Sequence, residues 1–274
     1  MSTTVSPSTA KAGTKPAKPR AVARTSRKPA TASESLKAVK VAAVPKTTGT
    51  AAAPALSTDQ IYTRILTAIL EHRLAPGTQL IEDKLATIFH VSRTKVREAT
   101  GRLVHDRIAI NIPNRGAFIA SPTPEEARQV FAARRMIEPG LTREATARAT
   151  PRQIAALRAH VTREARARAS GQSGALLLLT GEFHLMLAEV AGNGFLERTL
   201  RELESLTCLC IILYNAPGSP SCTPDEHEQL LAAVEARDAD RAASLMHHHL
   251  EHIEAGLNLA LRDDACRSLE DAFS

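Results

Sequence analysis

The feature that most constrains this fold is residues 58–120, where three short amphipathic helices precede two short strands. Ser57 or Thr58 is a good N-cap, and apolar residues then recur at helical spacing to about His72. Pro76 and Gly77 supply turn chemistry that ends this helix. The pattern predicts a first helix that hides one apolar face.

A second helix is predicted over residues 82–89, and Ser92 is the expected N-cap of a third helix. Residues 109–112 and 117–120 then alternate like strands around a turn at residues 113–116. Three helices followed by a hairpin predict a winged helix-turn-helix over residues 58–122.

Cationic and polar side chains gather where this unit would meet DNA. The start of a helix favours phosphate, and such a helix enters the major groove with its first residues on base edges. A basic hairpin tip can reach phosphate or the minor groove. Charge alone is equally consistent with a basic helix face that is only solvated and a hairpin that is only structural. The candidate DNA-binding residues are Ser92, Arg93, Thr94, Lys95, Arg97 and Arg102 on the helix, and Arg115 and Gly116 on the wing.

The net charge of +6 is unevenly distributed along the 274 residues. Residues 1–57 hold ten Lys or Arg and one acid (+9), residues 58–122 hold nine and six (+3), and residues 123–274 hold sixteen and 22 (−6). The first segment has almost no large apolar side chains, so a disordered basic tail is expected over 1–57. The tail either attracts DNA nonspecifically or is only a solvated extension.

From Pro124 onward the pattern is entirely helical. Glycine and proline clusters separate six predicted helices, which together form an all-α bundle with room for a pocket. The expected fold is mainly α: a winged helix-turn-helix, an all-helical effector and dimerisation domain at 123–264, and a tail at 265–274. The predicted helices span residues 124–146, 151–170, 174–191, 195–215, 223–236 and 238–262.

Three histidines, His184, His227 and His249, lie on the apolar stripes of three predicted helices. Imidazoles from three helices that face one core can form a metal site. Three unrelated histidines are the simpler alternative on spacing alone.

Residues 58–122 resemble the GntR family of bacterial regulators in the order and spacing of several motifs. Lys95 departs from the family pattern, which has proline after the Ser-Arg-Thr triplet, and this implies an altered base preference. The resemblance singles out Arg93, Thr94, Arg97 and the Arg115–Gly116 wing as DNA-binding residues. The matching segments are 74–82, 85–86, 91–98, 102–103 and 115–116.

Residues from about 124 to 261 are similar to the effector domain (FCD) of the FadR-type branch of that family. The similarity rests on Arg134 and Glu138 and on the segments 182–184, 191–193, 226–227 and 246–250. It implies that His184, His227 and His249 bind a divalent metal such as zinc or nickel, which helps to hold a carboxylate effector. The family's fourth metal ligand is an Asp, and Thr180 takes its position here. Two alternatives therefore remain: the metal binds more weakly, or the pocket binds its effector without a metal.

The resemblance further implies that Arg134 clamps the effector carboxylate, with Thr180 and Asn193 nearby. For Arg134 the alternative is a surface ion pair with Glu138, and for Asn193 a helix C-cap. Glu226 is expected to point away from His227, and no carboxylate occupies an evident general-base position near the histidines.

The expected function is a ligand-controlled repressor that binds a pseudo-palindromic operator as a homodimer, because two half-sites need two recognition helices. The chain is not expected to be an enzyme, although a hydrolase-like activity at the three histidines is one alternative, and nonspecific DNA packaging by the basic tail is another. No run of about 18 apolar residues exists. A cytoplasmic protein without a membrane span is therefore expected.

Overall fold

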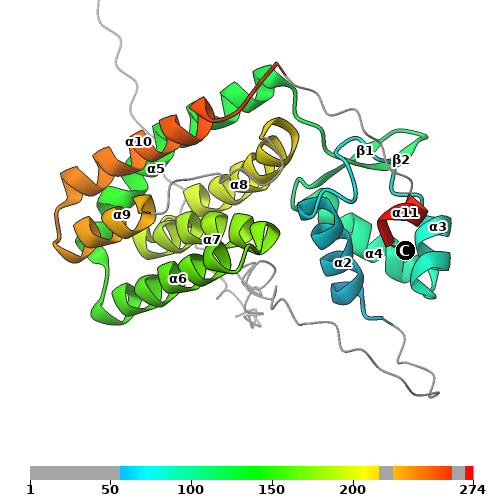
Figure 1. The fold of residues 1–274 in the computed structure, drawn as a ribbon, viewed down its shortest axis with the longest axis horizontal. Helices are drawn as coiled ribbons and strands as arrows, with labels where there is room; N and C mark the ends of the chain where they lie inside the picture. The colour runs from blue at the N-terminus through cyan, green and yellow to red at the C-terminus, as the bar shows by residue number, and fades with distance from the viewer. Residues whose placement is uncertain (1–55, 216–224, 261–268, 274) are drawn as a thin grey trace, which may run out of the picture. The chain divides into compact units, whose positions relative to one another are not determined.

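The structure is a computed structural model that describes residues 56–215, 225–260 and 269–273 (Figure 1). The predicted basic tail therefore lies outside the described residues except at positions 56 and 57. The helix break predicted at residues 217–220 lies outside them as well.

The first predicted helix is α2 (Thr58–Leu70), which starts with a capping box between Ser57 and Gln60. Helix α3 (Glu82–Phe89) ends at His90, whose left-handed backbone (φ 51°) turns the chain into α4 (Arg93–His105). Ser92 caps α4 by accepting a hydrogen bond from the Lys95 amide. Apolar faces of all three helices meet in one core, as the periodicity predicts.

Strands β1 (Ala109–Ile112) and β2 (Gly116–Ile119) pair antiparallel, with Ala109 opposite Ile119 and Ile112 opposite Gly116. Positive φ angles at Asn114 (60°) and Gly116 (84°) close the tight turn between them. Ile119 is buried against the helices, so the hairpin is a wing attached to the three-helix core.

The second half of the chain is helical, which confirms the mainly α fold class, but the last predicted helix (238–262) ends at Ala255, where Gly256 caps it. Helix α10 packs alongside α5, and α7 contacts α5, α6 and α8 (Figure 1). The helices are α5 (Pro124–Arg148), α6 (Pro151–Ala169), α7 (Ser173–Ala191), α8 (Gly194–Tyr214), α9 (Glu226–Glu235) and α10 (Ala239–Ala255).

Helix α7 is the one helix in the described part of the chain that is long and apolar enough to cross a membrane. No such helix was expected, because the sequence has no run of about 18 apolar residues. Half of this helix is buried inside the protein, and its neighbours are other helices. A buried core helix meets the same criteria of length and composition, so α7 alone does not indicate a membrane protein.

The predicted C-terminal tail contains a short helix, α11 (Leu269–Phe273), which packs on α3. Leu269 and Ala272 are buried, and the rings of Phe273 and Phe89 meet edge-to-face at 4.8 Å. Residues 269–273 thus belong to the core of the winged unit.

Candidate functional site: a histidine cluster beside a cavity

Helices α7, α9 and α10 bring His184, His227 and His249 together. All three side chains are buried. The Nε2 atom of His249 lies 3.2 Å from Nε2 of His227 and 3.2 Å from Nε2 of His184. The structure therefore gathers three nitrogen atoms at one point, as the helical stripes predict.

A carboxylate holds the other ring nitrogen of each histidine. The Nδ1 atoms of His184, His227 and His249 lie 2.5, 2.8 and 2.8 Å from carboxylate oxygens. An ionised carboxylate only accepts hydrogen bonds, so each Nδ1 carries the proton and each Nε2 presents a lone pair. Such carboxylate–histidine pairs orient the ligands of metal sites. In the same order, the acceptors are Glu138, Glu164 and Glu226.

The pKa shifts agree with neutral imidazoles beside ionised carboxylates. Burial lowers the pKa of His184 to about 3 and that of His249 to about 4. Burial raises the pKa of Glu138, but Arg134 and His184 outweigh it and bring the value down to about 2. The pKa of Glu164 also falls to about 2, because hydrogen bonds from His160 and His227 outweigh its burial. At neutral pH the cluster thus offers lone pairs rather than protons.

The cluster fits a divalent metal ion. Unprotonated nitrogens repel one another at such distances unless a cation lies between them, and Nε2 of His249 is 3.2 Å from that of each of the other two histidines. Tetrahedral zinc with Zn–N distances of about 2.0–2.1 Å separates its ligand atoms by about 3.3 Å, close to the observed spacing. Imidazole ligands suit zinc and nickel. The same three residues are one of two groups of potential metal ligands among the described residues.

The second group, Glu138, His184 and Glu204, already has a protein cation between its two carboxylates. The guanidinium of Arg134 lies 2.5 Å from Glu138 and 2.6 Å from Glu204. The three-histidine cluster is therefore the better metal site.

Thr180 lies one helical turn before His184, where the family has Asp. It is buried, and its hydroxyl donates a hydrogen bond to the Leu177 carbonyl at 2.9 Å. A neutral hydroxyl that is already used in this way is a poor metal ligand, so the fourth coordination position is left for water or an effector.

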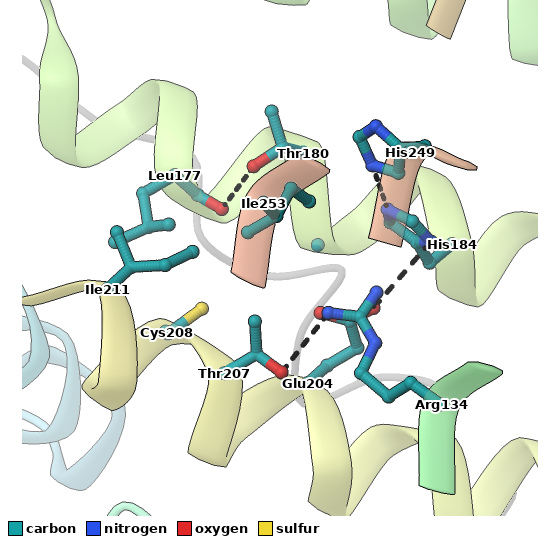
Figure 2. Close-up of a pocket in the computed structure, with 11 residues that line it drawn as sticks. Arg134, Leu177, Thr180, His184, Glu204, Thr207, Cys208, Ile211, His249 and Ile253 are labelled. Atoms are coloured by element: carbon teal, nitrogen blue, oxygen red, sulfur yellow. Dashed lines mark hydrogen bonds and ion pairs between the residues drawn. The ribbon is translucent and has the colours of Figure 1, made fainter. Parts of the chain in front are cut away.

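A cavity adjoins the cluster, and Figure 2 shows His184 and His249 close to Arg134 and Glu204, with Leu177 and Ile211 farther away on the other side. Its enclosed volume is about 20 Å³, room for about one water molecule and far below the ~300–1,000 Å³ of ligand pockets, so an effector would have to displace lining side chains. Its lining combines charged groups with aliphatic side chains. The aliphatic residues are Leu177, Ile211 and Ile253.

Arg134 lines this cavity, but its guanidinium is already bound within the protein. Besides its two carboxylate partners, Nη1 donates a hydrogen bond to Thr207 at 3.1 Å. Burial lowers its pKa, yet Glu138 and Glu204 outweigh this and raise it. Arg134 does form the ion pair with Glu138 that the alternative describes. The pair is buried rather than on the surface, because only 1–2% of either side chain is exposed.

Glu204 on α8 was not identified from the sequence. Burial is the main cause that raises its pKa, to about 8, and the charge of Glu138 adds to it while Arg134 opposes it. Nothing in the local sequence distinguishes Glu204 from other glutamates of α8, such as Glu197 and Glu202. Only the packing of α8 against α5 and α7 shows that it faces the cavity.

Two expectations about this region differ from the structure. Asn193 is exposed and caps α8 by accepting from the amides of Phe195 and Leu196, so it does not line the cavity. Glu226, which was expected to point away from His227, accepts a hydrogen bond from His249 and so belongs to the same cluster. Carboxylates therefore do surround the histidines, and those of Glu138, Glu164 and Glu226 accept from the three Nδ1 atoms.

The predicted DNA-binding residues divide into two groups. Ser92, Arg93, Thr94 and Arg97 are exposed at the start of α4. Arg97 donates three hydrogen bonds to the Glu82 carboxylate, of 3.1, 3.2 and 2.8 Å. Arg115 and Gly116 are exposed at the turn of the wing. These residues present cationic groups to solvent at the two places expected to contact DNA.

Lys95 and Arg102 instead support the fold of the winged unit. The Lys95 ammonium donates to the Leu56 carbonyl at 3.0 Å, at the start of α2. Arg102 pairs with Asp59 and lies over the Tyr62 ring at 4.7 Å. Both side chains therefore tie α4 to α2.

Known proteins match this arrangement over both halves of the chain. Residues 57–119 match the gntR family of bacterial regulatory proteins, and residues 129–252 match the FCD domain. The HTH-type transcriptional repressor RspR of Escherichia coli (strain K12) is 26% identical over 209 residues, covering 76% of this chain and 92% of RspR. The Nta operon transcriptional regulator of Aminobacter aminovorans is 26% identical over 184 residues, covering 66% of this chain and 85% of the relative.

Solved structures share the fold. E. coli McbR/YncC superposes with a TM-score of 0.60 at 21% identity, covering 72% of this chain and 95% of that chain. A GntR regulator from Rhodococcus sp. RHA1 gives 0.60 at 22% identity, with the same coverage. Proteins with this pair of domains are transcriptional regulators and not enzymes, and the chain belongs to the GntR family as a transcriptional regulator with a winged helix-turn-helix and an FCD domain.

Proposed function

We propose that this regulator is a cytoplasmic repressor that binds a pseudo-palindromic operator as a homodimer and responds to a small carboxylate. The repressor assignment is supported by RspR, a relative named as a transcriptional repressor. A homodimer supplies the two recognition helices that a two-fold DNA site needs. Residues 58–122 would bind DNA, and residues 123–264 would bind the effector and form the dimer.

At the DNA, the proposed contacts come from the start of α4 and from the wing. Arg93, Thr94 and Arg97 would read base edges in the major groove, and Ser92 would contact phosphate. Arg115 and Gly116 would contact phosphate or the minor groove. Lys95 and Arg102 would contribute positive charge close to the DNA while they hold α4 in place.

In the effector domain, His184, His227 and His249 would hold a zinc or nickel ion that presents a Lewis-acidic position to a carboxylate. The observation that supports this most strongly is the convergence of three Nε2 lone pairs, each fixed by a carboxylate at Nδ1. Thr180 and Arg134 line the cavity on which this position opens. Asn193 lies outside the cavity, so we place no effector contact there.

The effector would act by changing the relative population of two placements of the winged units. Its influence is limited by its difference in affinity for the two states. Helices α7, α9 and α10 each contribute one histidine, so an effector at the cluster would connect three helices.

A thermal-shift panel on chelator-stripped protein tests this proposal. Small carboxylates are added with and without zinc or nickel, and ligand at about 100 times its Kd stabilises the native state by about 2.7 kcal/mol. A shift that needs metal and carboxylate together is expected. If no carboxylate shifts the midpoint with or without metal, the proposed effector class is wrong.

A further inference from the structure

The short helix α11 lies on the winged unit and exposes two carboxylates there (Figure 1). Its sequence contains the apolar residues Leu269, Ala272 and Phe273 and the acidic residues Glu270 and Asp271. Leu269 and Ala272 are buried, whereas both acidic residues are exposed. The helix is therefore amphipathic, with its apolar side packed on the protein and its acidic side at the surface.

Contacts with α3 and with the loop after α2 hold the apolar side of α11. Phe273 meets the Phe89 ring of α3 edge-to-face, with ring centroids 4.8 Å apart, and the Arg73 guanidinium donates a hydrogen bond to the Ala272 carbonyl. Isolated helices shorter than about 12 residues are marginal in water, so the order of this five-residue helix depends on these contacts. The segment is therefore helical because it is docked on the winged unit.

The acidic side of α11 forms an ion pair with Lys84, in the first turn of α3. Lys84 Nζ lies 2.9 Å from Glu270 Oε1, and about half of each side chain is exposed. An ion pair at the surface is weak, so another anion can replace its carboxylate. The winged unit (58–122) carries +3 and the two acids of α11 carry −2, so their charges are complementary. DNA is also an anion and would compete with α11 for the same cation.

The first turn of α3 adjoins the residues proposed to read DNA. Asp83, next to Lys84 in the sequence, lies 2.9 Å from Arg93, and Glu82 lies 2.8 Å from Arg97. In a helix-turn-helix the first helix crosses the sugar-phosphate backbone while the second enters the major groove. A cation in the first turn of α3 is therefore well placed for a phosphate contact, and such contacts supply sequence-independent affinity.

We propose that Lys84 is a phosphate-binding residue of the DNA surface and that Glu270 of α11 occupies it in place of phosphate. The C-terminal helix thereby lowers the sequence-independent part of the DNA affinity. That part governs how much regulator is held at sites without an operator. The inference rests on the proposed placement of α4 at the DNA, and it adds a phosphate contact and the segment that withholds it.

Binding of the full chain to a fluorescent duplex of mixed sequence, measured from about 50 to 200 mM KCl, tests the proposal. Glu270→Gln should free Lys84 for one more phosphate. One additional contact steepens the slope of log K against log salt by about 0.9. Glu270→Gln should therefore bind more tightly than the wild type at the lowest salt, and the ratio of the two affinities should fall about threefold across the range.

Two further variants separate this contact from a general effect of charge. In a Lys84→Gln background, the gain from Glu270→Gln should disappear. Glu144→Gln removes the same charge from an exposed pair on α5, where Glu144 lies 3.2 Å from Arg148, and should leave duplex binding unchanged. Lys84 and Glu270 are about half exposed, so neither substitution should disturb the fold.

Unchanged or weaker duplex binding by Glu270→Gln would overturn the inference. An equal gain in Glu144→Gln, or a gain that survives in the Lys84→Gln background, would overturn it as well. Arg97→Ala on the same duplex tests the placement of α4 separately. A loss of binding in Arg97→Ala with no change in Glu270→Gln keeps α4 at the DNA and removes only the role of α11.

Discussion

Glu164→Gln tests whether the carboxylates behind the histidines serve metal binding. The Glu164 carboxylate lies on α6, is buried, and accepts from His227 Nδ1 at 2.8 Å. The His227 ring is also stacked on Phe183 with centroids 4.3 Å apart, so it has little freedom to find another partner. Removal of the charge should make His227 a weaker and less firmly oriented ligand.

Loss of such a partner weakens metal binding by about 10–100-fold, or about 1.4–2.8 kcal/mol. The amide side chain has nearly the volume of the carboxylate, so the helical bundle should remain folded. Zinc affinity is measured by titrating chelator-stripped protein in competition with a chromogenic chelator. Circular dichroism checks that the helical content is unchanged.

Glu182→Gln is the matched control. Glu182 approaches His160 and Arg163 at 3.8 and 3.5 Å but contacts no ligand histidine. Its zinc affinity should stay close to that of the wild type. Wild-type affinity in Glu164→Gln, or an equal loss in Glu182→Gln, would refute the assigned role of Glu164.

Three other changes test separate parts of the account. Arg97→Ala should weaken operator binding by about 1–3 kcal/mol, because Arg97 is expected to read a base. Arg107→Ala should leave operator binding unchanged. An unchanged footprint for Arg97→Ala would exclude Arg97 from the base-reading residues. Thr180→Asp should tighten zinc binding by supplying a carboxylate near the open position, and equal or weaker competition against the chelator would contradict this. Deletion of residues 269–274 should lower the unfolding free energy by about 2–3 kcal/mol, because the buried side chain of Leu269 is lost. An unchanged denaturation midpoint would show that α11 contributes little to stability.

The sequence is sufficient to predict the helices, the hairpin and the meeting of the three histidines. Ser57, Ser92 and the Pro76–Gly77 turn mark element ends through local hydrogen bonds and backbone geometry. Helical periodicity places His184, His227 and His249 on the buried faces of their helices. In a small bundle these faces all point into one core, so the three histidines are expected to lie close together. These features depend on neighbours along the chain, and the sequence contains them directly.

The partners of the site residues could not be predicted in the same way. Glu164 and Glu204 reach the site from α6 and α8, and their roles depend on how these helices pack. Asn193 was assigned to the effector site by resemblance, but its position at the start of α8 makes it a cap. Lys95 and Arg102 were counted as DNA contacts by charge, whereas their side chains reach α2 and its start.

The most direct test of the account is the zinc content of the chelator-stripped and reloaded full chain, measured beside two histidine variants. The account predicts one ion per chain in the wild type and in His247→Ala, which alters an exposed histidine of α10. His249→Ala should retain none while its winged unit stays folded. A wild-type chain that holds no ion, or a His249→Ala chain that holds as much as the wild type, would contradict the three-histidine site.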